Sequence, residues 1–479
     1  REEGGRQEGP RQAHPEDGMS GIPESVVIVG GGPGGYEAAL VAAQFGADVT
    51  VIESGGIGGA AVLTDCVPSK TLIATSDRVG RVNISGELGI RVDGQFPGPR
   101  TVSVDLELLN KRVLDLAAAQ SEDIAGRLRD AGVHIVEGHG RLVDAHTIAV
   151  DDVTFYGDVI LLATGAAPRE LPTAVPDGER ILTWQQLYDL AELPERLIVV
   201  GSGVTGAEFA GAYTALGSDV VLVSSRERVL PTQDPDAAEV LEVVLQNRGM
   251  ELSPRSRAEA VQRTEDGVVV TLQDGSTLTG THCLMAVGAV PNTADLGCET
   301  VGVAVDEHGY IQVDRVSRTS VNGIYAAGDC TGVLPLANVA AMQGRIAMWH
   351  ALGEAVSPLN LKVVSSNVFT DPQIASVGVT QAEVDSGVAR AHGIKLPLAT
   401  NARAKMQGFE DGFVKIFCRV SGTVVGAVVV APGASELIYP LALAVELGLN
   451  VDDLATTFAV YPSLSGSIAE AARRLHQVD

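Results

Sequence analysis

The sequence contains little cysteine. Its 479 residues include only five cysteines, an odd number, and no two of them have the C-x2-C spacing of zinc sites. We therefore expect neither a structural disulfide framework nor a metal site. This cysteine usage is typical of a reducing compartment and predicts a cytoplasmic location. The cysteines are Cys66, Cys283, Cys298, Cys330 and Cys418.

Basic residues are also scarce. There are 34 lysines and arginines against 60 aspartates and glutamates, which gives a formal net charge of -26. Proteins that bind nucleic acid neutralise its phosphates with a basic surface, so this balance argues against a nucleic-acid partner. The acidity itself is explained by solubility.

Long apolar runs are missing as well. The longest candidate, residues 424–445, is interrupted by two prolines, a serine and a glutamate. This pattern predicts a core strand followed by a helix, and no integral membrane association. Residues 1–19 are polar and charged and lack the apolar centre of a signal peptide. We expect residues 1–22 to form a disordered extension.

Glycine, in contrast, is abundant, with 55 residues, and it clusters in two matching segments. Residues 26–53 and 197–224 each contain an apolar strand, a GxGxxG loop, a helix and a second strand. Each helix stops at a glycine 16 positions after the first glycine of its loop. The repetition predicts two Rossmann units, each with a dinucleotide pyrophosphate at its helix N-terminus. The loop glycines are Gly30, Gly32 and Gly35 in the first copy, and Gly201, Gly203 and Gly206 in the second.

The two copies differ where the second strand ends. Glu53 follows Gly30 by 23 positions, where a carboxylate binds a ribose 2′-hydroxyl. The same count from Gly201 ends at Ser224, and Ser225, Arg226, Glu227 and Arg228 follow. Serine and arginine would accept a 2′-phosphate that a carboxylate would repel. The second copy is therefore predicted to use NADPH as well as NADH, although both arginines could also be plain solvated charges.

Residues 58–70 read Gly-Gly-Ala-Ala-Val-Leu-Thr-Asp-Cys-Val-Pro-Ser-Lys. This segment resembles the redox segment of the flavoprotein disulfide reductases, in which two cysteines are spaced C-x4-C. Ala61 stands at the first cysteine position and Cys66 at the second. Alanine cannot form a disulfide at any potential. Over residues 26–473 the chain is similar to this lipoamide dehydrogenase-like family. It resembles most the NAD(P)H:quinone reductase branch, which lacks the redox pair.

The resemblance implies an α/β fold. It consists of two Rossmann-type, doubly wound dinucleotide-binding domains and a C-terminal α+β dimerisation domain. The expected FAD-binding domain comprises residues 23–165 and 292–356, the NAD(P)-binding domain residues 166–291, and the dimerisation domain residues 357–479. The resemblance also implies a homodimer in which each C-terminal domain completes the active site of the other subunit.

The matching motifs imply two sets of cofactor contacts. Those expected for FAD are Gly30, Gly32, Pro33, Gly34, Gly35, Glu53, Ser54, Gly58, Gly59, Ala60, Cys66, Lys70, Gly140, Ala163, Thr164, Gly165, Asp329 and Ala337. Those expected for NADPH or NADH are Gly201, Gly203, Val204, Thr205, Gly206, Glu208, Ser224, Ser225, Arg226 and Gly288.

The resemblance also identifies candidate catalytic residues. Lys70 and Glu208 match a family ion pair beside flavin N5 and the nicotinamide, which predicts intact hydride transfer from NAD(P)H to FAD. The family's catalytic His-Pro-x4-Glu is replaced here, since Tyr461 stands for the histidine and Gly466 for the glutamate. A tyrosine with a pKa near ~10 is a poor base at neutral pH. Cys66 either contacts the flavin or is a buried relic.

These observations predict an FAD-dependent NAD(P)H:quinone oxidoreductase. Quinones accept two electrons from a flavin without a thiol or a base, so they suit a site that has lost its dithiol. One alternative keeps Cys66 as a single redox thiol, as in NAD(P)H oxidases, peroxidases and some disulfide reductases. An alternative of another class is a non-catalytic FAD-bound binding protein.

Overall fold

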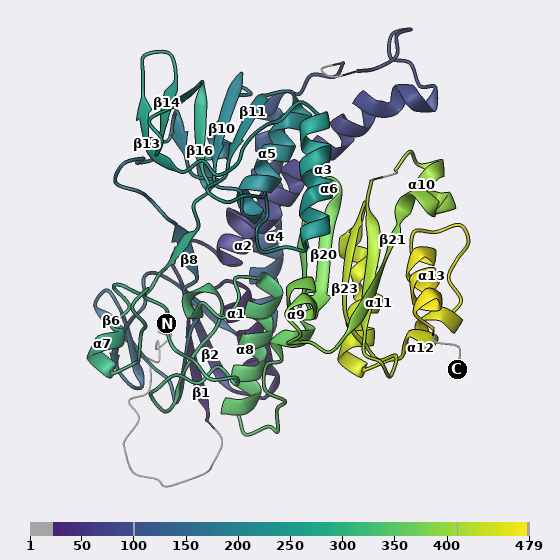
Figure 1. The fold of residues 1–479 in the computed structure, drawn as a ribbon. Helices are drawn as coiled ribbons and strands as arrows, with labels where there is room; N and C mark the ends of the chain where they lie inside the picture. The colour runs from purple at the N-terminus through teal and green to yellow at the C-terminus, as the bar shows by residue number, and fades with distance from the viewer. Residues whose placement is uncertain (1–22, 99–100, 410, 477–479) are drawn as a thin grey trace, which may run out of the picture.

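The computed structural model describes residues 23–98, 101–409 and 411–476. The extension predicted for residues 1–22 lies outside the described residues. The described chain forms three sheet-based parts, which Figure 1 shows at the lower left, the upper left and the right.

The first part is a five-stranded parallel sheet in the order β18-β7-β1-β2-β3. Its core strands are continuous apolar runs because both faces of the sheet are covered. Strand β18 comes from much later in the sequence than its neighbours, so the chain returns to this sheet, as the sequence predicted. The strands are β1 (Ser25–Val29), β2 (Asp48–Glu53), β3 (His134–Glu137), β7 (Val159–Leu162) and β18 (Ile324–Ala326).

Helices and a small second sheet complete this part. Helix α1 (Pro33–Gln44) packs against α8 (Ala337–Ala351). Their contact is tight, since a Cβ added at Gly344 would lie 2.0 Å from the Gly34 carbonyl oxygen. The other elements are α2 (Gly59–Leu63), α3 (Cys66–Ile84), α4 (Leu106–Asp130), α7 (Cys298–Val301) and the antiparallel strands β4 (Arg141–Asp144), β5 (Thr147–Val150) and β6 (Val153–Tyr156).

The second part repeats this design, with a parallel sheet in the order β12-β11-β10-β16-β9. The chain enters and leaves it through the antiparallel pair β8 (Ala166–Pro168) and β17 (Ala289–Pro291). The sheet strands are β9 (Ile181–Leu182), β10 (Arg196–Val200), β11 (Asp219–Val223), β12 (Glu251–Ser253) and β16 (His282–Met285). Beside them lie α5 (Val204–Leu216), α6 (Pro235–Asn247), β13 (Ala258–Arg263), β14 (Val268–Leu272) and β15 (Thr277–Gly280).

The third part is an antiparallel sheet in the order β19-β20-β23-β22-β21, with helices beside it. Residues 424–445 form a buried strand, β23 (Val424–Ala431), and most of α11 (Ala434–Leu447), which confirms the predicted strand and helix. The other elements are β19 (Ser365–Val368), β20 (Gln373–Gly378), β21 (His392–Pro397), β22 (Phe413–Cys418), α9 (Gln381–Asp385), α10 (Ala402–Met406), α12 (Val451–Thr456) and α13 (Gly466–Leu475).

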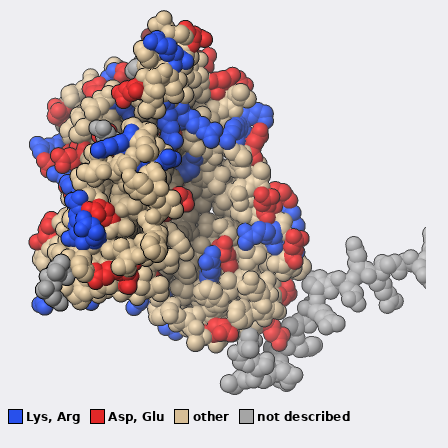
Figure 2. Space-filling view, turned by 90° about the vertical axis from the view of Figure 1, so that its right-hand side faces the viewer, with Lys and Arg blue, Asp and Glu red and all other residues tan. Residues whose placement is uncertain are grey.

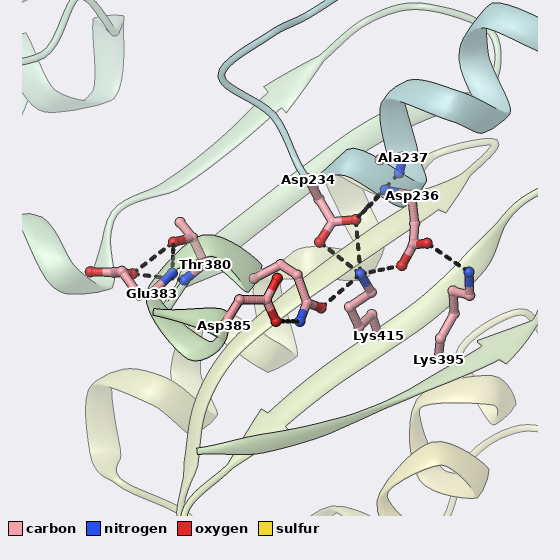
Figure 3. Close-up of polar contacts among 9 residues, drawn as sticks. Asp234, Asp236, Ala237, Thr380, Glu383, Asp385, Lys395 and Lys415 are labelled. Atoms are coloured by element: carbon pink, nitrogen blue, oxygen red, sulfur yellow. Dashed lines mark hydrogen bonds and ion pairs between the residues drawn. The ribbon is translucent and has the colours of Figure 1, made fainter. Parts of the chain in front are cut away.

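A buried ion-pair cluster joins the third part to the second (Figure 3). Lys415 of β22 is only 4% exposed, and its Nζ lies 2.8 Å from Asp234 and 2.5 Å from Asp236. Asp234 also caps α6, because its side chain accepts hydrogen bonds from the backbone N–H groups of Asp236 and Ala237. Lys395, in turn, bonds Asp236 at 2.8 Å. The cluster therefore fixes the N-terminus of α6 to the C-terminal sheet.

Charged side chains of both signs are interspersed over the face shown in Figure 2. Within residues 23–98, 101–409 and 411–476, no helix is both long and apolar enough to cross a bilayer. The same residues contain no cluster of three or more His, Cys, Asp or Glu side chains suited to a metal ion.

Candidate active site

The two glycine-rich loops have the same geometry. Gly30 and Gly201 have φ of +105° and +111°, and a Cβ at either would lie 2.2 Å from a carbonyl oxygen of a neighbouring segment. Only glycine fits such a turn. A Cβ at Gly35 or Gly206 would lie 1.8 Å from the carbonyl oxygen of the loop's first glycine. These four glycines are thus required by close backbone contacts.

The middle glycine of each loop has a different role. A Cβ built at Gly32 or at Gly203 meets no atom within 4 Å, so the backbone there faces open space. These residues precede α1 and α5 directly, and neither helix has a side chain capping its N-terminus. Free N–H groups at the positive end of a helix dipole bind phosphate. Both loops therefore fit a dinucleotide pyrophosphate.

Further polar groups surround the first loop. One carboxylate oxygen of Glu53 accepts a hydrogen bond from the Gly31 N–H at 2.5 Å, and the other accepts one from Gly55 at 2.6 Å. The Thr164 hydroxyl is buried and has no partner among the described residues. Such an orphaned group calls for a ligand. These residues fit the adenosine and pyrophosphate of FAD.

The returning segment lies beside this loop. The Ala327 N–H bonds the Leu162 carbonyl of β7, and Gly34 of α1 lies close to Ala327. Asp329 follows, and burial raises the pKa of its carboxyl group. Ala337 begins α8, whose N-terminus also has no side-chain cap. The predicted residues of this segment thus gather at the N-terminal ends of α1 and α8.

At the second loop, the polar residue that corresponds to Glu53 is bonded within the protein. Ser224 is only 2% exposed, and its hydroxyl is 2.6 Å from that of Ser202 inside the loop. The Ser224 oxygen also accepts a hydrogen bond from the Arg226 N–H. Ser225, Arg226 and Arg228 are exposed. Ser224 therefore shapes the loop, and the neighbouring arginines present charge to solvent.

Lys70 and Glu208 meet at the junction of all three parts. Lys70 Nζ, on α3, lies 2.8 Å from Oε2 of Glu208, on α5, and Glu208 is only 3% exposed. The other Glu208 oxygen accepts a hydrogen bond of 2.8 Å from the backbone N–H of Phe369, which follows β19. The Phe369 ring lies 5.1 Å from the ammonium group. The sequence motifs did not mark Phe369 as a site residue, because its contribution is a backbone N–H.

This pairing keeps the lysine charged. Burial alone would lower the pKa of Lys70, but the combined effects of Glu208, Cys66 and Asp65 outweigh it, so the pKa is raised. Asp65 lies at the start of α3, and burial raises the pKa of its carboxyl group. A cation is thus held beside Cys66 throughout the neutral range.

Cys66, the first residue of α3, is a free thiol. Burial, followed by the charge of Asp65, raises its pKa to about 11. The thiolate is the reactive form of cysteine, and it is nearly absent at neutral pH with such a pKa. Ala61 lies on α2, so the second sulfur of a disulfide is missing. The site therefore has one thiol, and its raised pKa disfavours the reactive thiolate form.

Comparison with known proteins agrees with this geometry. A family model described as "Pyridine nucleotide-disulphide oxidoreductase" matches residues 24–344. A second, described as the dimerisation domain of the same group, matches residues 364–472. The chain belongs to the pyridine nucleotide-disulphide oxidoreductase family. This confirms the fold class, the family resemblance and the expectation of a flavoprotein oxidoreductase.

Several members of this family are similar over nearly the full length. An NAD(P)H dehydrogenase (quinone) from Mycobacterium tuberculosis is 56% identical, covering 94% of this chain and 93% of the relative. A dihydrolipoyl dehydrogenase from Geobacillus stearothermophilus is 33% identical, covering 94% and 96%. The crystal structure of LpdA from Mycobacterium tuberculosis has a TM-score of 0.89 at 55% identity, covering 95% and 100%.

Family membership implies FAD and NAD(P)H as cofactors, and the two loops fit them. Other residues predicted to hold them also line these turns. Gly58 and Gly59 have positive φ, and a Cβ at Gly59 would lie 2.9 Å from Gly32. Gly140 packs on Val29, and Gly288 turns with φ of +97°. Ser54 and Ala60 are exposed near the same loop.

Tyr461 does not meet these residues within the subunit. It lies between α12 and α13 of the dimerisation domain and is 85% exposed. Among the described residues, no hydrogen bond or ion pair joins it to Lys70 or Glu208. Phe458 and Val460 beside it are 103% and 77% exposed. An apolar group of this kind on the surface is typical of an interface.

Proposed function

We propose that this chain is an FAD-dependent NAD(P)H:quinone oxidoreductase that works without a dithiol relay. The observation that supports it best is the combination of the Lys70–Glu208 ion pair with an alanine at position 61, which leaves Cys66 without a disulfide partner. The relative named NAD(P)H dehydrogenase (quinone), at 56% identity, supports the same acceptor. Bound FAD would accept a hydride from NAD(P)H and deliver two electrons to the quinone.

The residues contribute binding, orientation and charge. The open faces at Gly32 and Gly203 and the free helix N-termini would hold the two pyrophosphates. Glu208 fixes the Lys70 ammonium group, and Phe369 fixes Glu208. A fixed cation stabilises negative charge that develops near it without any reorganisation during the reaction. Cys66 takes no proton and forms no bond in this scheme.

Acceptor assays test this proposal. We expect the FAD-loaded protein with NADPH to reduce menadione rapidly and to reduce the disulfides lipoamide and oxidised glutathione poorly. Cys66→Ser should retain quinone reduction. Loss of all reductase activity in Cys66→Ser with FAD retained would favour the single-thiol alternative. A flavin band that NADPH does not bleach under anaerobic conditions would favour the non-catalytic alternative.

We further propose that the enzyme uses both NADH and NADPH, with NADPH equal or preferred. Arg226 and Arg228 are exposed beside the second loop, and Ser224 leaves no carboxylate at the strand end. One charged hydrogen bond to a 2′-phosphate contributes roughly 1.5–3 kcal/mol, or about 10- to 150-fold in affinity. Arg226→Ala combined with Arg228→Ala should raise the KM for NADPH and leave that for NADH nearly unchanged. Equal changes for both cofactors would exclude this role.

We propose a homodimer in the cytoplasm. The dimerisation-domain match and the exposed Phe458, Val460 and Tyr461 support an interface at the C-terminal domain. Five free cysteines suit a reducing compartment. In the dimer, Tyr461 is expected to stand near the partner's quinone site, as the family resemblance implies.

A further inference from the structure

A separate cavity lies behind the Lys70–Glu208 pair. It has a volume of about 780 Å³ and lies between α3, α5, the C-terminal end of α6 and the loop after β19. Small residues face each other across two of these helices, since a Cβ added at Gly80 of α3 would lie 3.9 Å from the Cβ of Ala215 on α5, an ordinary van der Waals contact. The volume is that of a small-molecule site.

The cavity wall contains polar atoms without partners. Ser218 is 7% exposed, and its hydroxyl forms no hydrogen bond with any described residue. The side-chain oxygen of Asn83 is buried and equally unpartnered. Both residues line the cavity. Buried polar atoms are nearly always bonded, so these point to a bound molecule.

Among the charged groups that line the cavity, only carboxylates lack an ion-pair partner in the described residues. Arg248 is bound to Asp371 at 2.8 Å, Arg196 is bound to Asp219 and Glu251, and Glu208 is bound to Lys70. Asp77 of α3 also lines the cavity, and the described residues offer it neither a hydrogen bond nor an ion pair. Glu195 also lines the cavity without an ion pair among the described residues, but it is exposed, so Asp77 is the more buried of the wall's two unmatched carboxylates. Apolar side chains around it include Ile73, Ala212, Leu216 and Leu245.

We propose that this cavity binds a small organic cation, with its apolar body between α3 and α5 and its protonated amine against Asp77. The amine supplies hydrogen-bond donors to the Asp77 carboxylate, and donors elsewhere on the ligand or on water meet the unpartnered oxygens of Asn83 and Ser218. The apolar body covers the small-residue faces of the two helices. The cavity shares Glu208 and Phe369 with the Lys70 site but includes neither Cys66 nor the dinucleotide loops, so the proposal does not depend on the quinone activity.

The FAD-loaded protein and three probes of one shape test this. Phenylbutylamine, phenylbutanol and phenylbutyrate are titrated by calorimetry at about pH 8, where Asp77 is mostly ionised. We expect the amine to bind about tenfold or more tightly than the alcohol, and the carboxylate to bind weakest. Asp77→Asn should remove the preference for the amine. Asp266→Asn, the same change at an exposed hairpin turn, should keep it.

A second variant tests the cavity independently of Asp77. Ala215→Leu places side-chain volume in the open space and should weaken the amine and the alcohol alike, with the flavin spectrum and dimer unchanged. The proposal is wrong if the wild type binds no probe, as it would if the partner subunit fills the cavity. It is also wrong if the amine binds the wild type, Asp77→Asn and Ala215→Leu with equal affinity.

Discussion

Single side chains decide the chemistry of this protein. Lys70 and Cys66 are four positions apart on one helix, yet their surroundings favour the charged form of the lysine and the neutral form of the cysteine. Glu208 keeps the lysine charged, whereas burial and Asp65 keep the thiol neutral. A charged lysine without a reactive thiol favours hydride chemistry and disfavours disulfide exchange.

Lys70→Met tests the cation directly. The change removes a fixed charge and leaves the Glu208 carboxylate, which is 3% exposed, without its partner. We expect flavin reduction by NADPH to slow roughly a hundredfold, the scale of losing one preorganised electrostatic group. Stopped-flow absorbance of the FAD-loaded protein measures this rate. Lys111→Met, which affects an exposed lysine of α4, is the control, and equal rates in both variants would contradict the role of Lys70.

Asp77 should make stability depend on pH. Burial, and next the charge of Asp371, raise its pKa from 3.8 to about 7, against the opposing effect of Arg81 and Arg248. Between these values the folded state binds more protons than the unfolded state, so this group lowers stability as pH rises from about 4 to about 7. Asp77→Asn removes this pH-dependent loss of stability, because asparagine does not ionise.

The difference in Tm between Asp77→Asn and the wild type should therefore grow in favour of the variant across that range and stay constant above it. Thermal unfolding of the FAD-loaded protein at about pH 5 and about pH 8 measures this. Asp266→Asn should show no such trend. A difference in Tm that is independent of pH would mean that Asp77 gains a cationic partner in the dimer.

At the scale of elements, strand β22 and helix α6 are held together by buried charge. Lys415 is matched by Asp234 and Asp236, which come from the first turn of α6 and its cap. Removing one member of a buried pair leaves the other uncompensated, which costs about 3–5 kcal/mol. An exposed pair contributes only about 0–1 kcal/mol.

Lys415→Met should therefore destabilise the protein strongly and loosen the N-terminus of α6. Lys395→Met is the matched control, because Lys395 binds the same Asp236 but its side chain is 46% exposed. Chemical denaturation and hydrogen exchange of the first turn of α6 report the two effects. Similar stability of the two variants would mean that water solvates the Asp234 carboxylate once Lys415 is removed.

At the scale of the whole molecule, the exposed apolar group of the C-terminal domain predicts the assembly. Phe458→Asp with Val460→Asp should convert the dimer to monomers, because a charge in an apolar interface is costly. Light scattering measures the mass, and quinone reduction should fall with it if Tyr461 completes the partner's site. Val420→Asp changes a residue that is 79% exposed elsewhere on the same domain and should leave the dimer intact. A stable dimer in both variants would place the interface elsewhere.

The sequence alone determined the local features of this protein. The glycines of both loops, their helix stops and the division of residues 424–445 into strand and helix depend on near neighbours, so their spacing was sufficient. The missing sulfur at Ala61 was equally plain from the sequence. The pairing of Lys70 with Glu208, 138 positions away, came only from the family resemblance.

Only the tertiary structure decided what surrounds each group. In the fold, the Phe369 N–H donates a hydrogen bond to Glu208, and the Ser224 hydroxyl bonds Ser202 within its own loop. Lys415 pairs with Asp234, which is 181 positions away in the sequence. It also left Asp77 unpaired in a cavity. The physical reason is that burial, charge pairing and pKa depend on neighbours distant in sequence, which a local pattern does not specify.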